Sequence, residues 1–206
     1  MKPEIQVNIH SSIRIQGENT VIYIDPYKID REVHDADIIF ITHDHYDHFS
    51  IEDIRKVSKT DTLFVAPKNM EHHLAGWCTF LLSPAETTEV LGIPVEAVAS
   101  YNIPPKPFHP KSKENLGYVL TVDRQRIYVA GDTDSIPEMK KIRCDIALVP
   151  IGGTYTMNYK EAALIVNKLE PKIVIPVHYG SVAGKIAHGE KFRSLVADGI
   201  ETVLLI

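Results

Sequence analysis

The segment DADIIFITHDHYDHFS, residues 35–50, joins an apolar run to a polar run that is rich in metal-binding side chains. Three histidines and two aspartates fall within six consecutive positions of it. His43 and His45 are two positions apart, so on a tightly turning segment their rings can converge on one ion, while Asp47 and His48 turn toward a second. Imidazole and carboxylate ligands suit zinc first, with manganese or iron as alternatives. The segment therefore predicts part of a metal site.

The residues on either side of this polar run predict where it lies in the fold. Residues 35–41 read as a continuous buried strand. Residues 50–58 space their apolar side chains as a helix does, behind a Ser50 N-cap with Asp53 in the capping-box position. The candidate ligands are therefore expected in the turn between a strand and a helix.

The size of the chain predicts one domain, residues 1–206. A chain of 206 residues can bury one sizeable core. Its composition, 44% hydrophobic and 24% charged, is that of a globular protein, and no stretch reads as a linker or a disordered tract.

Charge and cysteine content narrow the class of protein. The net charge of -5 supplies no basic field for a polyanion, which disfavours nucleic acid and leaves a small molecule as the expected partner. Cys78 and Cys144 are far apart and form no CxxC pair, so neither a disulfide framework nor a thiolate zinc site is predicted. No run resembles a signal peptide or approaches the roughly 20 apolar residues of a membrane span. We expect a cytoplasmic protein, and a homo-oligomer is compatible with the sequence.

The order of apolar segments predicts the architecture. Residues 4–26 read as an antiparallel meander of three short strands, and Arg124–Gln125 is the predicted turn of a later hairpin. From residue 145 onward strands alternate with helices, the helices being expected within 159–170 and 189–198. Two β-rich halves with helices outside them predict an α/β fold, a four-layer αββα sandwich.

Further candidate ligands follow later strands. Two metals about 3.5 to 4 Å apart need six or more protein ligands, and the opening segment supplies four. Asp132 follows the apolar run RIYVAG, His178 follows KIVIPV, and His109 lies in the loop after VEAVAS. This placement is expected to gather all three on one edge of the sheets.

These motifs together resemble a known family. THDHYDH (42–48) resembles the T-H-x-H-x-D-H motif of the metallo-β-lactamase fold superfamily, and GDTD (131–134) and PVHYG (176–180) are similar to its later aspartate and histidine elements, in the same order. The resemblance spans nearly the whole chain and implies the metallo-β-lactamase fold. AGDTDSIPEM with PIGGTYTM resembles the branch that contains L-ascorbate-6-phosphate lactonase and many metal-dependent hydrolases.

The resemblance also implies how the ligands divide between two divalent metal ions. Metal one would be held by His43 and His45, metal two by Asp47, His48 and His178, with Asp132 bridging both.

One ligand departs from the superfamily pattern, which has a histidine just past the strand that ends near Ser100. Here that place holds Asn102, and His109 follows seven residues later. His109 is expected to complete metal one, and an asparagine, a water or an open position is the alternative.

Other residues are expected near the substrate. The segment GGTYTM (152–157) could turn backbone N–H groups and the Tyr155 hydroxyl toward an anion or a developing oxyanion, or it could be an ordinary strand-to-helix connection. Tyr155 and Asn102 are the predicted substrate-binding residues.

Four further residues have two interpretations each. Asp25 and Thr42 resemble positions that brace the ligand loop, or they form an ordinary strand-end turn. His10 lies near the pocket, or it caps a strand. Lys185 could meet a substrate phosphate, or it is a surface residue.

These predictions combine into a binuclear metal-dependent hydrolase. A hydroxide between the metals would attack a small ester or lactone, with or without a phosphate group, and Asp47 would accept and pass on its proton. One alternative is a phosphodiesterase acting on nucleic acid or a cyclic nucleotide. The other is a non-hydrolytic metal-binding protein.

Overall fold

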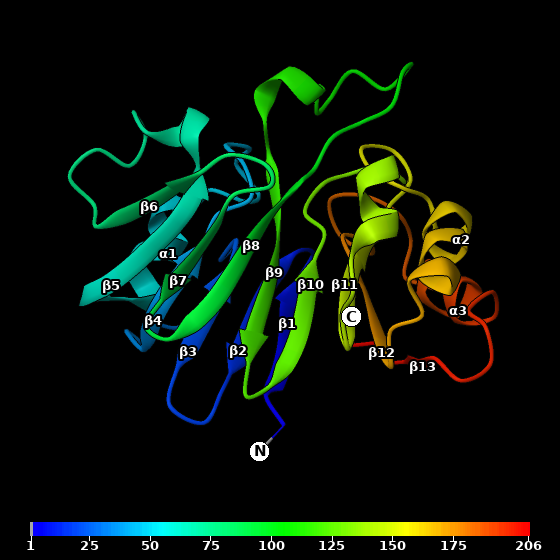
Figure 1. The fold of residues 1–206 in the computed structure, drawn as a ribbon, viewed down its shortest axis with the longest axis horizontal. Coiled ribbons are helices and arrows are strands. Elements are labelled where there is room, and N and C mark those ends of the chain that lie inside the picture. Colours follow the sequence, from blue (N-terminus) through cyan, green and yellow to red (C-terminus); the bar gives the residue numbers. More distant parts are fainter. Residues whose placement is uncertain (1) are drawn as a thin grey trace.

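The structure, a computed structural model, describes residues 2–206. Over these residues the chain forms two mixed β-sheets that pack face to face, with helices on the outer faces (Figure 1). The first sheet contains, in spatial order, β1 (Glu4–Ile9), β2 (Ser12–Gln16), β3 (Val21–Ile24), β4 (Ala36–Phe40), β5 (Ser58–Pro67) and β6 (Thr79–Leu82). The second contains β13 (Glu201–Thr202), β12 (Ile173–Val177), β11 (Ile146–Pro150), β10 (Gln125–Val129), β9 (Leu116–Val122), β8 (Ile93–Ala99) and β7 (Thr87–Val90).

Each sheet has an antiparallel part and a parallel part. Strands β1 to β3 form the predicted antiparallel meander, and β3 to β6 run parallel. Likewise β7 to β10 are antiparallel and β10 to β13 are parallel. Because parallel strands end at the same edge of a sheet, the residues that follow β10 and β12 meet there.

The core between the sheets follows the two-residue period of the strands. In β2, Ile13 and Ile15 are buried while Arg14 between them is half-buried. These isoleucines join one cluster with Leu120 and Leu148 of the second sheet. Each such side chain stabilises the fold by about 1.5 to 3 kcal/mol on burial, so this cluster holds the two sheets together.

The helices cover the outer faces. Helix α1 (Ile51–Val57) packs Ile54 and Val57 against the first sheet. Helices α2 (Tyr159–Leu169) and α3 (Ala187–Arg193) cover the second sheet (Figure 1). The result is the predicted αββα sandwich. The connections also contain the short 3-10 helices η1 (Lys68–Met70), η2 (Lys111–Lys113) and η3 (Pro137–Lys141).

Some local predictions need correction. The hairpin between β9 and β10 turns at Asp123–Arg124, one residue earlier than predicted, because Gln125 pairs with Val122. Both turn residues have positive φ, 47° and 65°, the conformation that two-residue hairpins favour. Strand β7 was not predicted, and β13 is only two residues long.

The start of α1 also differs in detail. Ser50 caps the helix as predicted, with its hydroxyl oxygen accepting from the N–H of Asp53. The Asp53 carboxylate, however, accepts from the N–H groups of Lys28 and Ile29 at 2.9 and 3.0 Å, so it anchors the loop after β3. Within residues 2–206, no helix is both long and apolar enough to cross a membrane.

Candidate metal centre

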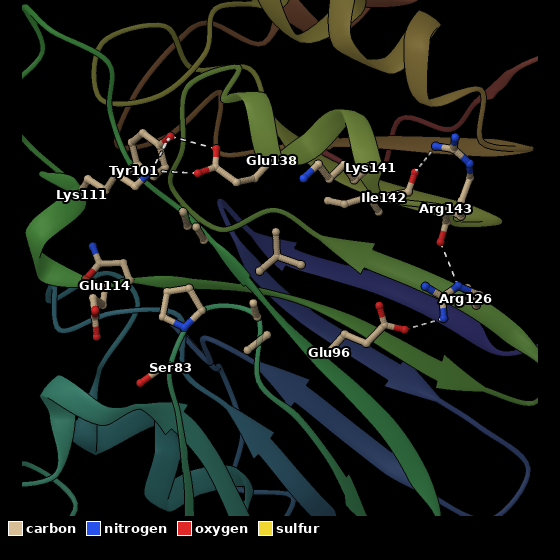
Figure 2. Close-up of a pocket in the computed structure, with 17 residues that line it drawn as sticks. Ser83, Glu96, Tyr101, Lys111, Glu114, Arg126, Glu138, Lys141, Ile142 and Arg143 are labelled. Carbon is tan, nitrogen blue, oxygen red and sulfur yellow. Dashed lines mark hydrogen bonds and ion pairs between the residues drawn. The ribbon is translucent and has the colours of Figure 1, made fainter.

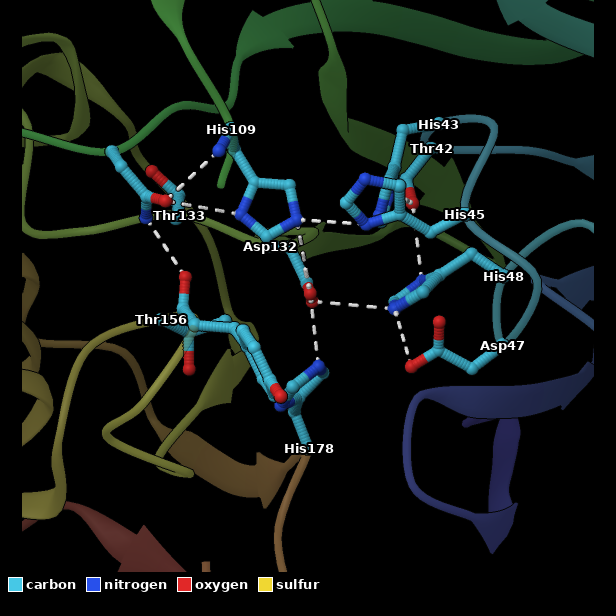
Figure 3. Close-up of polar contacts among 12 residues, drawn as sticks. Thr42, His43, His45, Asp47, His48, His109, Asp132, Thr133, Thr156 and His178 are labelled. Carbon is cyan, nitrogen blue, oxygen red and sulfur yellow. Dashed lines mark hydrogen bonds and ion pairs between the residues drawn. The ribbon is translucent and has the colours of Figure 1, made fainter. Parts of the chain in front are cut away.

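The ligand-rich loop between β4 and α1 is a tight turn. The N–H groups of His48 and Phe49 both donate to the carbonyl oxygen of His45, at 3.0 and 2.8 Å. The turn brings the side chains of His43, His45 and His48 together (Figure 3), with the centroid of the His43 ring 4.6 Å from that of His45 and 4.1 Å from that of His48.

Asp25, at the end of β3, holds this turn in place. One carboxylate oxygen accepts from the Thr42 N–H at 2.8 Å, and the other accepts from the Thr42 hydroxyl at 2.6 Å and lies 2.7 Å from Nδ1 of His48. All three residues are buried. With a proton on Nδ1, the His48 ring turns Nε2 toward Asp132. The contacts of Asp25 with Thr42 and His48 match the bracing role predicted for Asp25 and Thr42.

The first group of ligand atoms comes from His43, His45 and His109, and these atoms lie within 4.8 Å of one another. Nε2 of His109 lies 3.2 Å from Nδ1 of His45, and the His43 and His109 rings are 5.0 Å apart. The loop between β8 and β9 therefore brings His109 to the place expected for the remaining ligand of metal one.

Asn102 lies behind His109. Its side-chain oxygen accepts from the His109 N–H at 3.0 Å and lies 3.2 Å from Nδ1 of the same ring, while its amide donates to the carbonyl oxygen of Tyr155 at 2.8 Å. Asn102 is buried and is not among the pocket-lining residues. This geometry favours a positioning role for Asn102 over the predicted contact with substrate.

The second group contains the predicted Asp47, His48 and His178, and also His10. Nε2 of His10 lies 3.1 Å from a carboxylate oxygen of Asp47, and the His10 ring packs 3.7 Å from the ring of His178. His10 is fully buried in the turn between β1 and β2. Of its two interpretations, the structure supports a position at the site.

Asp132 lies between the two groups (Figure 3). One of its oxygens is 3.5 Å from Nε2 of His48, and the other is 2.9 Å from Nε2 of His178 and 3.5 Å from Nε2 of His109. Gly131 precedes it with φ of 66°, where a Cβ would meet a backbone oxygen at 2.8 Å. Only glycine fits that turn, which directs the carboxylate toward the histidines.

Four side-chain atoms of this cluster are buried without a hydrogen-bond partner among the described residues: Nε2 of His43, Nε2 of His48, Oδ1 of Asp132 and Nδ1 of His178. A buried polar atom without a hydrogen bond costs about 1 to 3 kcal/mol, so several together are unfavourable unless another group binds them. Divalent cations such as zinc take these nitrogen and oxygen ligands. The residues therefore fit a metal.

The cluster combines neutral histidines with one charged histidine–carboxylate pair. Burial lowers the pKa of His43 well below its ordinary value and that of His109 to about 4, so both rings are neutral and can donate a lone pair. Burial alone would raise the pKa of Asp132, but His178 and His48 outweigh it and hold the pKa well below the usual range. Burial opposes a charge on His48, yet Asp132 and Asp25 raise its pKa well above normal.

A cavity of about 460 Å³ opens onto the cluster. Candidate ligands form its floor, and Tyr46, Phe108, Tyr155 and Val182 form its walls. Its volume is within the range of small-molecule sites. The structure thus places the predicted Tyr155 on the wall of this pocket.

A larger cavity, about 650 Å³, lies elsewhere, against β8 and η3 (Figure 2). Four of its charged groups have polar partners within it: Glu138 accepts from Tyr101 and Lys111 at 2.9 Å each, and Arg126 donates to Glu96 at 2.6 Å. None of the predicted metal ligands lines it. The candidate site is therefore the smaller cavity.

Comparison with known proteins identifies the family. Residues 4–178 match the family model of the beta-lactamase superfamily domain. The chain belongs to the metallo-β-lactamase fold superfamily.

Relatives within this superfamily match nearly the whole chain. A UPF0173 metal-dependent hydrolase of Thermococcus onnurineus is 31% identical over 218 residues, covering 95% of this chain and 93% of the relative. Another, of Thermoplasma acidophilum, is 34% identical over 213 residues, covering 96% and 92%.

Solved structures agree. A crystal structure from Parabacteroides distasonis, assigned as a metal-dependent hydrolase, has a TM-score of 0.85 and 34% identity and covers 98% of this chain and 92% of its own. A metallo hydrolase of Ignicoccus hospitalis has the same fold, with a TM-score of 0.78 at 23% identity, covering 98% of this chain and 94% of its own. The predicted superfamily and fold are confirmed, and the predicted enzyme class is the one named for these relatives. The lactonase branch remains a prediction.

Proposed function

We propose that this chain is a metal-dependent hydrolase that binds two divalent cations and hydrolyses a small ester or lactone. The observation that carries the proposal is a set of buried ligand atoms without a hydrogen-bond partner among the described residues, one on His43 of the first group, one on His48 of the second group and one on Asp132 between the groups. The names of the superfamily relatives, metal-dependent hydrolases, support the same class.

The two groups of donors suggest one cation each. Asp132 faces His48 with one oxygen and His109 and His178 with the other, so a carboxylate shared by two cations accounts for its position. The proposed ligands are His43, His45 and His109 for one cation and Asp47, His48 and His178 for the other, with Asp132 shared. When bound, the cations would lower the pKa of a shared water toward neutrality and polarise a carbonyl oxygen.

Asp47 is the proposed proton carrier. Burial alone would raise the pKa of its carboxyl, but the hydrogen bond with His10 and the nearby His48 outweigh burial and lower it. Asp47 is therefore charged at neutral pH, and it lines the pocket. It can accept a proton from the attacking water and pass it to the leaving oxygen. Tyr155 lines the same pocket, where its hydroxyl can orient the substrate carbonyl.

The test is an activity screen of the metal-depleted protein reloaded separately with zinc, manganese and iron. Substrates are p-nitrophenyl acetate, a panel of lactones and bis(p-nitrophenyl) phosphate. The variants are Asp132→Asn and, as a matched control, Asp145→Asn, which removes a carboxylate from the opposite end of the parallel strands of the same sheet.

We expect ester or lactone turnover that falls at least about 100-fold in Asp132→Asn and changes little in Asp145→Asn. Turnover that survives Asp132→Asn contradicts the shared carboxylate. Turnover of the phosphodiester alone favours the phosphodiesterase, and bound metal without turnover favours a non-hydrolytic role.

A further inference from the structure

We infer that the substrate carries an uncharged, apolar substituent, with an aromatic ring as the best fit, on the part of the molecule that lies against the pocket wall. This inference rests on the proposed function, because it names the substrate class of the same site. Of the two options that the sequence left open, a substrate with or without a phosphate group, it favours the one without.

The walls of the pocket are aromatic and aliphatic. Phe108 is 41% exposed and Tyr46 is 67% exposed, although both carry large aromatic rings whose faces water solvates poorly. The Phe108 ring meets the Tyr155 ring edge to face, with centroids 4.8 Å apart and planes at 81°. Val182 adds an aliphatic wall. Exposed aromatic rings that surround one cavity favour an apolar ligand over a hydrated one.

The same walls offer no cation to a phosphate. Among the described residues that line this cavity there is no lysine or arginine, and the one lining carboxylate outside the proposed ligand set is Asp44. A phosphate distant from the reacting carbonyl would lose hydration at these walls with no cationic side chain to compensate.

Lysines on the neighbouring loops already have partners. Lys106 donates to a carboxylate oxygen of Asp134 at 2.5 Å and to the carbonyl oxygen of Thr156 at 2.7 Å. Nζ of Lys113 lies 3.9 Å from the Asp44 carboxylate. The amine of Lys106 is therefore occupied, and neither lysine lines the cavity.

Backbone donors of the glycine-rich segment are also partly used. The N–H of Gly153 donates to the carbonyl oxygen of Met157, and the N–H of Met157 donates to that of Thr133, both at 3.0 Å. Lys185 is exposed and does not line the pocket. Lys185 therefore receives no support as an anion-binding residue, and two N–H groups of the segment are not available to an anion.

The volume agrees with an aromatic substituent. An apolar cavity of about 150 Å³ accepts a benzene ring. The pocket, at about 460 Å³, has room for such a ring together with the reacting ester or lactone.

The experiment compares five-membered lactones that share the reacting bond and differ only in one ring substituent: methyl, phenyl or phosphorylated hydroxymethyl. With the metal-loaded protein we expect kcat/KM for the phenyl lactone to exceed that for the phosphorylated lactone by at least about tenfold. Phe108→Ala should lower the ratio of kcat/KM for the phenyl lactone to kcat/KM for the methyl lactone about fivefold or more. Leu164→Ala, which changes an exposed apolar residue of α2, is the matched control and should leave this ratio unchanged.

A gain-of-function variant tests the charge. Val182→Lys should raise the ratio of phosphorylated to methyl lactone turnover about fivefold or more, because it adds the missing cation. Preference of the wild type for the phosphorylated lactone overturns the inference, as does an unchanged ratio of phenyl to methyl lactone turnover in Phe108→Ala.

Binding separates this inference from the proposed function. Ligand-observed NMR with each lactone should show the phenyl lactone binding about tenfold more tightly than the phosphorylated one, and this difference should disappear in Phe108→Ala. If the protein binds in this order but hydrolyses none of the lactones, the proposed function fails and the pocket assignment stands. If the protein hydrolyses lactones without this order, the pocket assignment fails and the function stands.

Discussion

Asp25→Asn tests whether the carboxylate behind His48 prepares that ring for metal. Asp25 contacts no proposed metal position, yet it accepts from the Thr42 N–H at 2.8 Å and lies 2.7 Å from Nδ1 of His48. Asparagine keeps the shape and can keep the first bond, which places its NH₂ group against Nδ1. That contact favours the tautomer with the proton on Nε2, the atom that faces Asp132. We therefore expect metal affinity to fall.

The size of the effect follows from similar contacts around metal ligands. Loss of a group that orients a ligating histidine costs about 10- to 100-fold in affinity, or about 1.4 to 2.7 kcal/mol. Asp132 and Asp25 also raise the pKa of His48, so in the wild type a metal must displace a proton from this ring. Asp25→Asn weakens that competition at low pH. The loss of affinity should therefore be larger at pH 8.5 than at pH 6.5.

The assay is titration of the metal-depleted protein with zinc against a competing chelator, at both pH values. Asp37→Asn is the matched control, since Asp37 is a carboxylate of the same sheet that accepts from the Val21 N–H at 2.7 Å, away from the cluster. Circular dichroism checks that both variants are folded. Equal zinc affinity in Asp25→Asn and the wild type would refute the orienting role.

Three further predictions concern positioning, packing and pH. Asn102→Ala should lower the affinity for one metal of the pair about tenfold, because the His109 ring loses the contact that orients it. The same zinc titration measures this, and an unchanged affinity would contradict the positioning role of Asn102. Gly117→Ala should lower the free energy of unfolding, measured in urea, by about 2 kcal/mol or more, because the added Cβ would lie 2.6 Å from the Ala130 carbonyl oxygen. Thr121→Ala on the same strand is the control and should lower the free energy of unfolding by less. The metal-free protein should lose stability as pH falls from 6.5 to about 4: below pH 6.5 the unfolded chain protonates His109 while the folded chain, with a pKa of about 4, does not. His109 alone contributes about 3 kcal/mol to the free energy of unfolding over that window. A plot of the urea midpoint against pH should therefore be flatter for His109→Gln than for the wild type. Parallel plots for the two proteins would contradict the low pKa of His109.

Much of the fold could be predicted because its signals are local. The two-residue period in β2 separates Ile13 from Arg14, and the helical spacing after Ser50 defines α1. The ligands on the turn after β4 could be found because they are contiguous. Asp132 and His178 could be found because each follows an apolar strand and parallel strands end at one edge.

The remaining features depend on contacts between distant segments. His10 joins the second group only because β1 and β2 turn beside β12, where the His178 N–H donates to the His10 carbonyl oxygen at 2.9 Å. The position of Asn102 behind His109 depends on the path of a long loop, which no periodicity describes. The pocket wall combines Tyr46, Phe108 and Val182 from separate loops, so no local pattern could have predicted its apolar character.

The central claim is that two cations share Asp132. The most direct test is the metal content per chain, measured by inductively coupled plasma mass spectrometry after loading with zinc and removal of the excess, for the wild type, Asp132→Ala and His43→Ala. Two zinc ions per wild-type chain, falling to one or fewer in both variants, is the predicted result. A wild-type ratio of one or below, or a ratio of two that both variants retain, would contradict it.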